Sequence, residues 1–450
     1  MCLLSCRMSS RGPKIVKTKP IRPQYAEKFR CIGAACEDTC CQGWGVPIDK
    51  STYDKYQALS EGPLRVLMEE HLERTGSANE FEFARMKLDS NGVCPFLSKD
   101  RLCDIQKEHG EAYLSVTCSN YPRNTKTIDS IRERTLLLSC PEAARLVLLD
   151  RRLVPLKKDA RSRGARYDAL LAAVANTPPA ATPLACFWPV RNFSVMLLLD
   201  RSYPLWQRVF LLSMLCKRIQ AFMDKREWNR IPALLTEHVS MIATGSLRTA
   251  LHTIPAQTSL QLGIVMTLIE EYATSCARQR RFAECIEDFA HGIGHEPGRT
   301  ATDLAQNYVD AYNHYYSPWA AKHEFMLENY FLNYVFGRLF PFGNPGPEQG
   351  LHPYREAQLL CFQYGLIKGL LIGMAGHYRS SFSSDHVVKL MQSFAKAVEH
   401  NASLLLRIEN FFQTRGLNDT NGIAALLRDG APEAPAQALK VPTQVPVSPL

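Results

Sequence analysis

The stretch "YGLIKGLLIGMAGHY", residues 364–378, indicates the fold class of this chain. Its large apolar residues recur at three- and four-residue intervals, which predicts a helix. The glycines at positions 365, 369, 373 and 376 lie mostly four apart, so a helix would place them in one smooth strip. Lys368 and the short apolar run argue against a membrane dimerisation motif. We therefore expect this helix to pack closely against another part of the backbone.

The same periodicity recurs on both sides of this stretch, and strand-like alternation is scarce. The predicted fold class is therefore mainly α, with an N-terminal cysteine-rich metal-binding module followed by a multi-helix domain. Helices are predicted at residues 205–223, 258–275, 300–316, 323–339, 356–376 and 385–413.

Composition shifts indicate where the chain divides. In "AAVANTPPAATPLAC", residues 172–186, alanine and proline replace the charged pattern, and proline makes helix continuation difficult. The tail after Gly430 carries five prolines and almost no large apolar groups, so burial cannot offset its ordering entropy. We predict a flexible basic segment at 1–24, a cysteine-rich metal or iron-sulfur module at 25–170, an all-helical domain at 187–428 and a disordered tail at 429–450.

Composition also restricts the compartment. The 450 residues are 46% hydrophobic, which is enough for two or three domains with proper cores. The opening "MCLLSC" lacks the features of a signal peptide. The longest apolar run without a charge, Val209–Cys216, falls far short of the roughly 20 residues that cross a bilayer. We expect a soluble, cytoplasmic protein without a membrane span.

Fifteen cysteines in a chain without an export signal point to metal binding or thiol chemistry rather than disulfides. Ten of them precede residue 141, whereas the others lie singly in apolar, helix-like sequence. We expect those five to be small buried hydrophobic residues. They are Cys186, Cys216, Cys276, Cys285 and Cys361.

Eight cysteines are the predicted metal ligands, because soft thiolates select zinc or iron-sulfur clusters over hard cations. They suffice for two four-coordinate sites, or for one cluster with thiols left over. The spacing C-x4-C-x3-C-C matches neither zinc ribbons, nor the ferredoxin run, nor the C-x3-C-x2-C of radical S-adenosylmethionine enzymes. The first set is Cys31, Cys36, Cys40 and Cys41, and the second is Cys94, Cys103, Cys118 and Cys140.

A resemblance joins these motifs. In their order and separation, "FRCIGAACEDTCCQGWGVPID", "CPFL", "LCDIQKEHGE", "TCSNYPR" and "LSCPEAARL" resemble the bacterial flagellin lysine-N-methylase family, and so does "ENYFLNYVFGRLFPFG". The resemblance implies methyl transfer from S-adenosylmethionine to lysine side chains of flagellin. It also places the family's cysteine pattern on the eight cysteines named above, with an iron-sulfur cluster of the 4Fe-4S type favoured and zinc as the alternative.

No cofactor-binding or catalytic residue is assigned from the sequence. The nearest approach to a glycine-rich nucleotide turn, "HGIGHEPG" at 291–298, has the wrong spacing and no strand before it. Arg123 is a candidate for holding a carboxylate or phosphate, and equally an ordinary surface arginine. Trp44 is interpreted as a lid on the metal module, and the twelve aromatic residues from Tyr308 to Phe342 as core rather than a cation cage.

Two other functions fit the same residues. One is a non-catalytic, metal-stabilised protein that binds flagellin or another secretion substrate. The other is an iron-sulfur redox protein that uses the Cys40 and Cys41 pair. Nucleic-acid binding is not expected, because no zinc-finger spacing or recognition helix is present.

Overall fold

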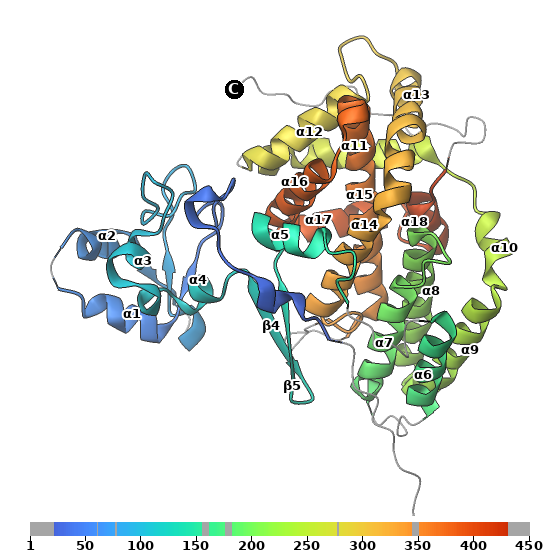
Figure 1. Ribbon diagram of the computed structural model, residues 1–450, viewed down its shortest axis with the longest axis horizontal. Helices are drawn as coiled ribbons and strands as arrows, with labels where there is room; N and C mark the ends of the chain where they lie inside the picture. The colour runs from blue at the N-terminus through green and yellow to red at the C-terminus, as the bar shows by residue number, and fades with distance from the viewer. Residues whose placement is uncertain are drawn as a thin grey trace, which may run out of the picture.

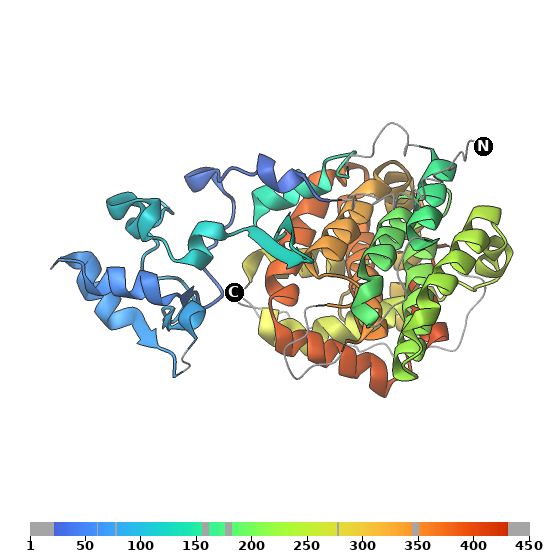
Figure 2. The ribbon, with the colours of Figure 1, turned by 90° about the horizontal axis from the view of Figure 1, so that it is seen from below.

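The computed structural model describes residues 22–60, 62–76, 79–154, 162–175, 182–276, 279–343 and 351–430. Most of these residues are helical, which confirms the mainly α prediction. Figures 1 and 2 both show a small N-terminal part beside a larger helical body, with a β-hairpin between them. The predicted flexible segment falls outside the described residues up to position 21, and the predicted tail does so from position 431.

The small N-terminal part has a core of its own. Its three short strands pair antiparallel in the order β1-β3-β2. Nine buried residues between Val46 and Ile105 fill this core, and Cys94 and Cys103 pack against it. The elements are β1 (Pro47–Ile48), α1 (Lys50–Gln57), α2 (Pro63–His71), β2 (Leu72–Arg74), β3 (Ala84–Met86), α3 (Asp104–His109) and α4 (Val116–Asn120).

The hairpin of β4 (Arg123–Ile128) and β5 (Ile131–Leu136) is held firmly on the helical body. Glu133 of β5 forms a fully buried ion pair with Arg191, at 2.7 Å between carboxylate and guanidinium. On β4, the Asn124 side-chain amide donates a hydrogen bond to the Gly337 carbonyl. One face of the hairpin is therefore fixed against the helices, and the other is left to face outward.

The helical body begins at α5 and contains two π-helical turns. Its helices are α5 (Pro141–Leu148), α6 (Arg163–Ala175), α7 (Phe187–Leu198), α8 (Leu205–Asp224), α9 (Ile231–Thr244), α10 (Leu247–His252), α11 (Thr258–Cys276), α12 (Arg280–Gly292), α13 (Ala301–Ala311), α14 (Ser317–Gly337), α15 (Pro353–Tyr378), α16 (Ser384–Phe394), α17 (Ala402–Thr414) and α18 (Thr420–Leu427). The π-helical turns are Tyr312–Tyr316 and Ala395–Glu399.

Helix α15 is the central helix, and its glycines allow close packing, against backbone at Gly373 and Gly376 as predicted, and against side chains at Gly365 and Gly369. A Cβ atom added to Gly376 would lie 2.6 Å from the carbonyl oxygen of Gly292 on α12, and one added to Gly369 would lie 2.4 Å from Val265 on α11. Only hydrogen at these positions lets neighbouring helices approach so closely. The glycine 292 of "HGIGHEPG" thus serves helix packing, where α12 crosses α15.

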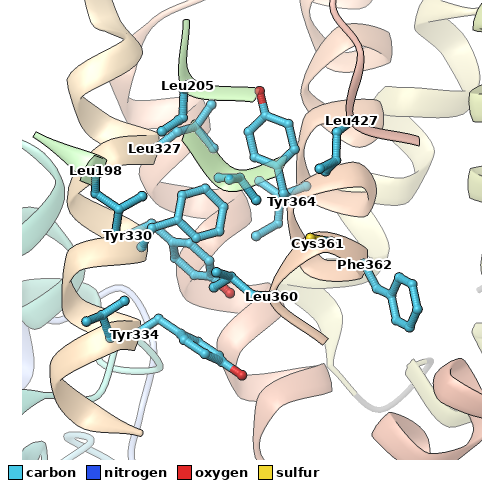
Figure 3. Close-up of a cluster of buried hydrophobic side chains, with 14 of the residues drawn as sticks. Leu198, Leu205, Leu327, Tyr330, Tyr334, Leu360, Cys361, Phe362, Tyr364 and Leu427 are labelled. Carbon is cyan, nitrogen blue, oxygen red and sulfur yellow. The ribbon is translucent and has the colours of Figure 1, made fainter. Parts of the chain in front are cut away.

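Aromatic side chains of α14 and α15 meet in the core, as Figure 3 shows for Tyr330, Tyr334 and Tyr364. The interpretation of the aromatic run as core is confirmed for most of its members, because nine of the twelve are buried: Tyr308, Tyr316, Phe325, Tyr330, Phe331, Tyr334, Phe336, Phe340 and Phe342. The prediction of buried single cysteines is confirmed for Cys186, Cys216, Cys285 and Cys361. The side chain of Cys276 lies outside the described residues.

The main core extends beyond the predicted helical range. Tyr25 and Phe29 near the start, and α5 and α6 before residue 176, pack into the same core as the later helices. The predicted ranges 25–170 and 187–428 stay predictions about independently folding units.

One described helical segment, Pro353–Ser381, is long and apolar enough to span a membrane by length and composition. However, 89% of its apolar window is buried inside the protein, as in the core helix of a soluble domain. Within it, the Lys368 ammonium donates to the Leu427 carbonyl and pairs with Asp429 at 2.8 Å. These contacts account for a buried charge in an otherwise apolar helix.

Candidate functional site

A cleft of about 1060 Å³ is lined by both the small N-terminal part and the helical body. The cysteine loop contributes Cys40 and Trp44, α4 and the following turn contribute Asn120 and Tyr121, and the segment after α16 contributes His400. The hairpin supplies a further wall. A cleft of this size can hold a cofactor together with a substrate side chain.

An aromatic pair stands beside Cys40. The Trp44 and Tyr121 rings lie 6.0 Å apart between centroids, at an angle of 34°. The Trp44 indole nitrogen donates a hydrogen bond of 2.9 Å to the Cys40 carbonyl, which ties the ring to the cysteine loop. Trp44 also packs against the small core and lines the cleft, while its role as a lid on a metal module stays a prediction.

A chain of polar groups links this pair to the helical body. The Tyr121 hydroxyl lies 3.0 Å from Ser139 Oγ, and His400 Nε2 lies 2.8 Å from the same oxygen. His400 directly follows the π-helical turn Ala395–Glu399, a type of irregularity that is frequent at functional sites. Burial, together with the charges of Arg338 and Lys396, lowers the pKa of His400 and favours a neutral imidazole near pH 7.

The same π-helical turn anchors the cysteine loop. Lys396 pairs with Asp38 at 2.8 Å and donates to the Thr39 carbonyl at 2.9 Å. Gln392, one turn earlier, donates to both Asp38 and the Ser139 carbonyl. The loop that carries Cys36, Cys40 and Cys41 is thus held against helices more than 350 residues away in the sequence.

The lining of the cleft is strongly cationic. Among the described residues that line it there is no aspartate or glutamate, whereas the lining includes four arginines and Lys396. A cleft lined by one sign of charge concentrates ligands of the opposite sign. The four arginines are Arg85, Arg123, Arg132 and Arg134.

The thiols of the eight predicted cysteine ligands interact electrostatically in two groups that differ from the two sets along the sequence. Besides burial, repulsion by a Cys40 thiolate raises the pKa values of the second-set thiols Cys94, Cys103 and Cys118. Cys94 and Cys103 likewise raise the pKa of Cys41. The same repulsion links Cys140 to Cys36, and Cys36 to Cys31. Cys40 also interacts with Cys140, so it stands where the two groups meet.

Within the larger group, the backbone brings the two sequence sets together. The Cys94 amide donates a hydrogen bond of 2.8 Å to the Cys41 carbonyl, and Leu97 forms a β-bridge with Cys103. Cys118 lies in α4, where Ser115 caps the helix by accepting from the Cys118 amide. Burial raises the pKa of Cys94 to about 11 and that of Cys118 to about 12, and the neighbouring thiols add to both shifts.

The pKa values of the two adjacent thiols, Cys40 and Cys41, shift in opposite directions. A hydrogen bond from the Cys41 thiol lowers the pKa of Cys40 to about 7, while the same bond and burial raise the pKa of Cys41. Across the residues that the structure describes, no three histidine, cysteine or acidic side chains are already gathered in a metal-binding arrangement. The ligand role of the eight cysteines stays a prediction.

Comparison with known proteins now identifies the family. The model of the FliB lysine N-methylase C-terminal domain matches residues 191–426, more than half of the chain. The chain belongs to the FliB lysine N-methylase family. The sequence-based resemblance to lysine-N-methylases is thereby confirmed.

Relatives of the family cover nearly the whole chain. The lysine-N-methylase of Salmonella typhimurium is 23% identical over 424 residues, which are 90% of this chain and 98% of that protein. The corresponding protein of Salmonella choleraesuis is also 23% identical, over 419 residues. The flagellar biosynthetic protein FliU of Salmonella muenchen is 37% identical over 129 residues, 28% of this chain and 76% of that protein. No solved structure matches the chain.

Sequence reasoning found part of this site. The sequence alone indicated Trp44, Arg123 and the cysteines as candidate site residues. It gave no indication of His400, Ser139 or Lys396. Three other histidines have different surroundings: His314 and His323 bond backbone carbonyls of their own helix segments, and His109 lies against Tyr113. His400 and Ser139 are 261 positions apart, and no spacing rule connects them.

Proposed function

We propose that this lysine N-methylase transfers methyl groups from S-adenosylmethionine to lysine side chains of flagellin in the cytoplasm, and that the cleft holds both reactants. The observation that carries the proposal is the meeting of Cys40, the Trp44 and Tyr121 rings, and the Ser139 and His400 pair at one cleft. The names of the relatives support lysine methylation, and the name FliU supports a flagellar substrate.

The lining suits the methyl donor. Aromatic faces attract both an adenine ring and a sulfonium, so Trp44 and Tyr121 are the groups that would hold them. Arg123, which donates to the Phe29 carbonyl and lies 5.0 Å above the Phe29 ring, is placed to bind the donor carboxylate. The donor supplies an electrophilic methyl group on a positively charged sulfur.

The substrate amine must be neutral to react, because an ammonium nitrogen has no lone pair. A free lysine has a pKa of about 10.4, so the site has to favour the neutral form. The cationic lining does this, because neighbouring positive charges lower the pKa of an amine. The nitrogen then forms its bond to the methyl carbon as the bond between that carbon and sulfur breaks.

We assign to His400 the role of accepting the proton that the amine loses. In the tautomer whose Nε2–H donates to Ser139 Oγ, the lone pair lies on Nδ1, where it can take a proton. The lowered pKa of His400 keeps this lone pair available near neutral pH. Ser139, itself bonded to Tyr121, fixes the direction of the ring.

The cysteines would hold an iron-sulfur cluster, with zinc as the alternative. The thiol donors fit either group, and the larger group, Cys40, Cys41, Cys94, Cys103 and Cys118, would have to draw its sulfurs together around the metal from segments that a backbone hydrogen bond between Cys94 and Cys41 already joins. Among the described residues, the small core beside them has nine buried apolar members, so a metal bound to these thiols would stabilise the module that carries Trp44. Bound metal would also neutralise thiolates that otherwise repel one another.

The proposal is tested by incubating anaerobically purified protein with S-adenosylmethionine and unmodified flagellin and recording the intact mass of the flagellin. Mass increments of one methyl group that require both protein and donor are expected. His400→Gln should slow them, whereas His314→Gln, a matched change at an exposed histidine, should not. A stable complex with flagellin and no mass change would overturn the enzyme proposal in favour of a binding protein.

A further inference from the structure

The strand register separates two faces of the hairpin. Residues at alternate positions, such as Asn124, Glu133 and Thr135, face the helical body, where Glu133 pairs with Arg191. Because side chains alternate along a strand, the residues between them face the opposite way. Those residues include Arg123, Thr125, Arg132 and Arg134, and all four line the cleft, to which Asn124 at the start of β4 also contributes.

The arginines on this face are short of carboxylate partners. Arg132 and, across the cleft on β3, Arg85 are exposed, and neither pairs with an acid among the described residues. Arg134 lies 3.5 Å from Glu27, whose side chain is 74% exposed, so this pair is weak. We use the name arginine face for three arginines that line the cleft together: Arg85 on β3, and Arg132 and Arg134 on β5.

The methyl donor does not account for so much positive charge. S-adenosylmethionine carries one carboxylate against an ammonium and a sulfonium, so it is a net cation, and one arginine satisfies its carboxylate. The target lysine adds another positive charge. A lining with two unpaired arginines and one weakly paired arginine therefore needs negative charge from another part of the complex.

We infer that the arginine face binds carboxylates of the protein substrate that lie close to the target lysine. This inference rests on the proposed function, since it concerns the partner of the same cleft. Guanidinium groups bind carboxylates in a two-pronged geometry, which gives direction as well as attraction. The arginine face would then select lysines in acidic surroundings and hold the nitrogen toward His400.

Equilibrium binding tests the inference without turnover. Two labelled peptides that contain one lysine, flanked either by Asp and Glu or by Asn and Gln, are titrated with the full-length protein, and fluorescence anisotropy gives each Kd. The double variant Arg85→Gln/Arg132→Gln is compared with Arg299→Gln, which removes a charge from an exposed arginine outside the cleft lining. Both substituted arginines are exposed, and matching thermal melts would verify that the variant is folded.

We expect the acidic peptide to bind the wild-type protein on the order of tenfold more tightly, and the double variant to lose most of this preference. Arg299→Gln should keep it, and added salt should weaken it. Equal Kd values for the two peptides would overturn the inference. So would tighter binding of an oligonucleotide of equal charge that the double variant abolishes, since this would make the face a nucleic-acid site. Methylation of either peptide, measured separately by mass, decides the proposed function independently.

Discussion

His400 Nε2 lies 2.8 Å from Ser139 Oγ, although the two residues are separated by 261 positions. Ser139 belongs to the segment that carries Cys140, and His400 ends the π-helical turn that also holds Asp38 through Lys396. The hydrogen bond thus joins the cysteine-rich half of the chain to the helical half at the cleft. Changes at His400 are therefore expected to affect the chemistry in this cleft.

His400→Gln should lower kcat for flagellin methylation by about 100-fold, the lower range for loss of a positioned acid-base group. Glutamine keeps a polar group near Ser139 but cannot accept a proton from an amine. Donor affinity, measured by calorimetry, should be unchanged. A loss of donor affinity with unchanged kcat would instead make His400 a donor-binding group.

The pH profile of the same variant gives a second readout. The neutral imidazole is the active form, so the wild-type rate should rise with pH through the pKa of His400. Because the surroundings lower that pKa below its usual value of about 6.5, the rise should be nearly complete at pH 7. In His400→Gln this acidic inflection should vanish, leaving only the rise that comes from ionisation of the lysine at higher pH.

Trp44→Ala and Tyr121→Phe should affect different steps. Loss of the Trp44 ring removes stacking worth about 1–3 kcal/mol, so donor binding should weaken by about fivefold to 100-fold. Tyr121→Phe keeps its ring but releases Ser139, so kcat should fall while donor affinity stays. Phe81→Ala, at a ring that is 74% exposed and does not line the cleft, is the control.

Calorimetry with S-adenosylmethionine and steady-state kinetics check both changes. If Trp44→Ala bound the donor as tightly as the wild type, the donor would have to lie elsewhere in the cleft.

The helices were predictable because long periodic apolar segments override local detail. Predicted helices at 205–223 and 258–275 agree with α8 and α11 to within one or two residues at their ends. The range 385–413 was predicted as one helix, but it is interrupted at His400 and restarts where the Asn401 side chain accepts from the Leu404 amide. In the cysteine-rich part, helix α3 ends at His109, because Gly110 adopts a φ of 81°.

The site was predictable only in part, because its residues meet through tertiary packing. Cysteine spacing marked the thiols, yet it could not show that Cys140 interacts electrostatically with Cys36, and Cys118 with Cys94. Cys140 directly precedes α5, which packs into the main core with the later helices. Likewise, no local pattern marks Lys396 as the partner of Asp38.

Metal analysis should separate structural from ligand cysteines. Anaerobically purified protein should contain iron and acid-labile sulfide, or zinc, and Cys103→Ser should lose most of this content because it removes a thiol from the larger group. Cys186→Ala should keep it, since Cys186 is fully buried in the main core, away from the other thiols. Elemental analysis and the visible spectrum provide the measurement, and equal metal in both variants would contradict the ligand role of Cys103.

The close crossing of α12 and α15 should make the stability of the helical body sensitive to a side chain at position 292. A Cβ atom on Gly292 would lie 1.7 Å from the carbonyl oxygen of Gly373, and a backbone atom cannot rotate away as a side chain can. Gly292→Ala should therefore destabilise the helical body by about 1–3 kcal/mol or more, which exceeds the gain in helix propensity of up to about 1 kcal/mol. Gly164→Ala in α6 meets nothing within 4 Å, so only the propensity gain applies there. The urea midpoint should fall for Gly292→Ala and stay or rise for Gly164→Ala, and a Gly292→Ala midpoint equal to the wild type would show that α12 and α15 do not pack this closely.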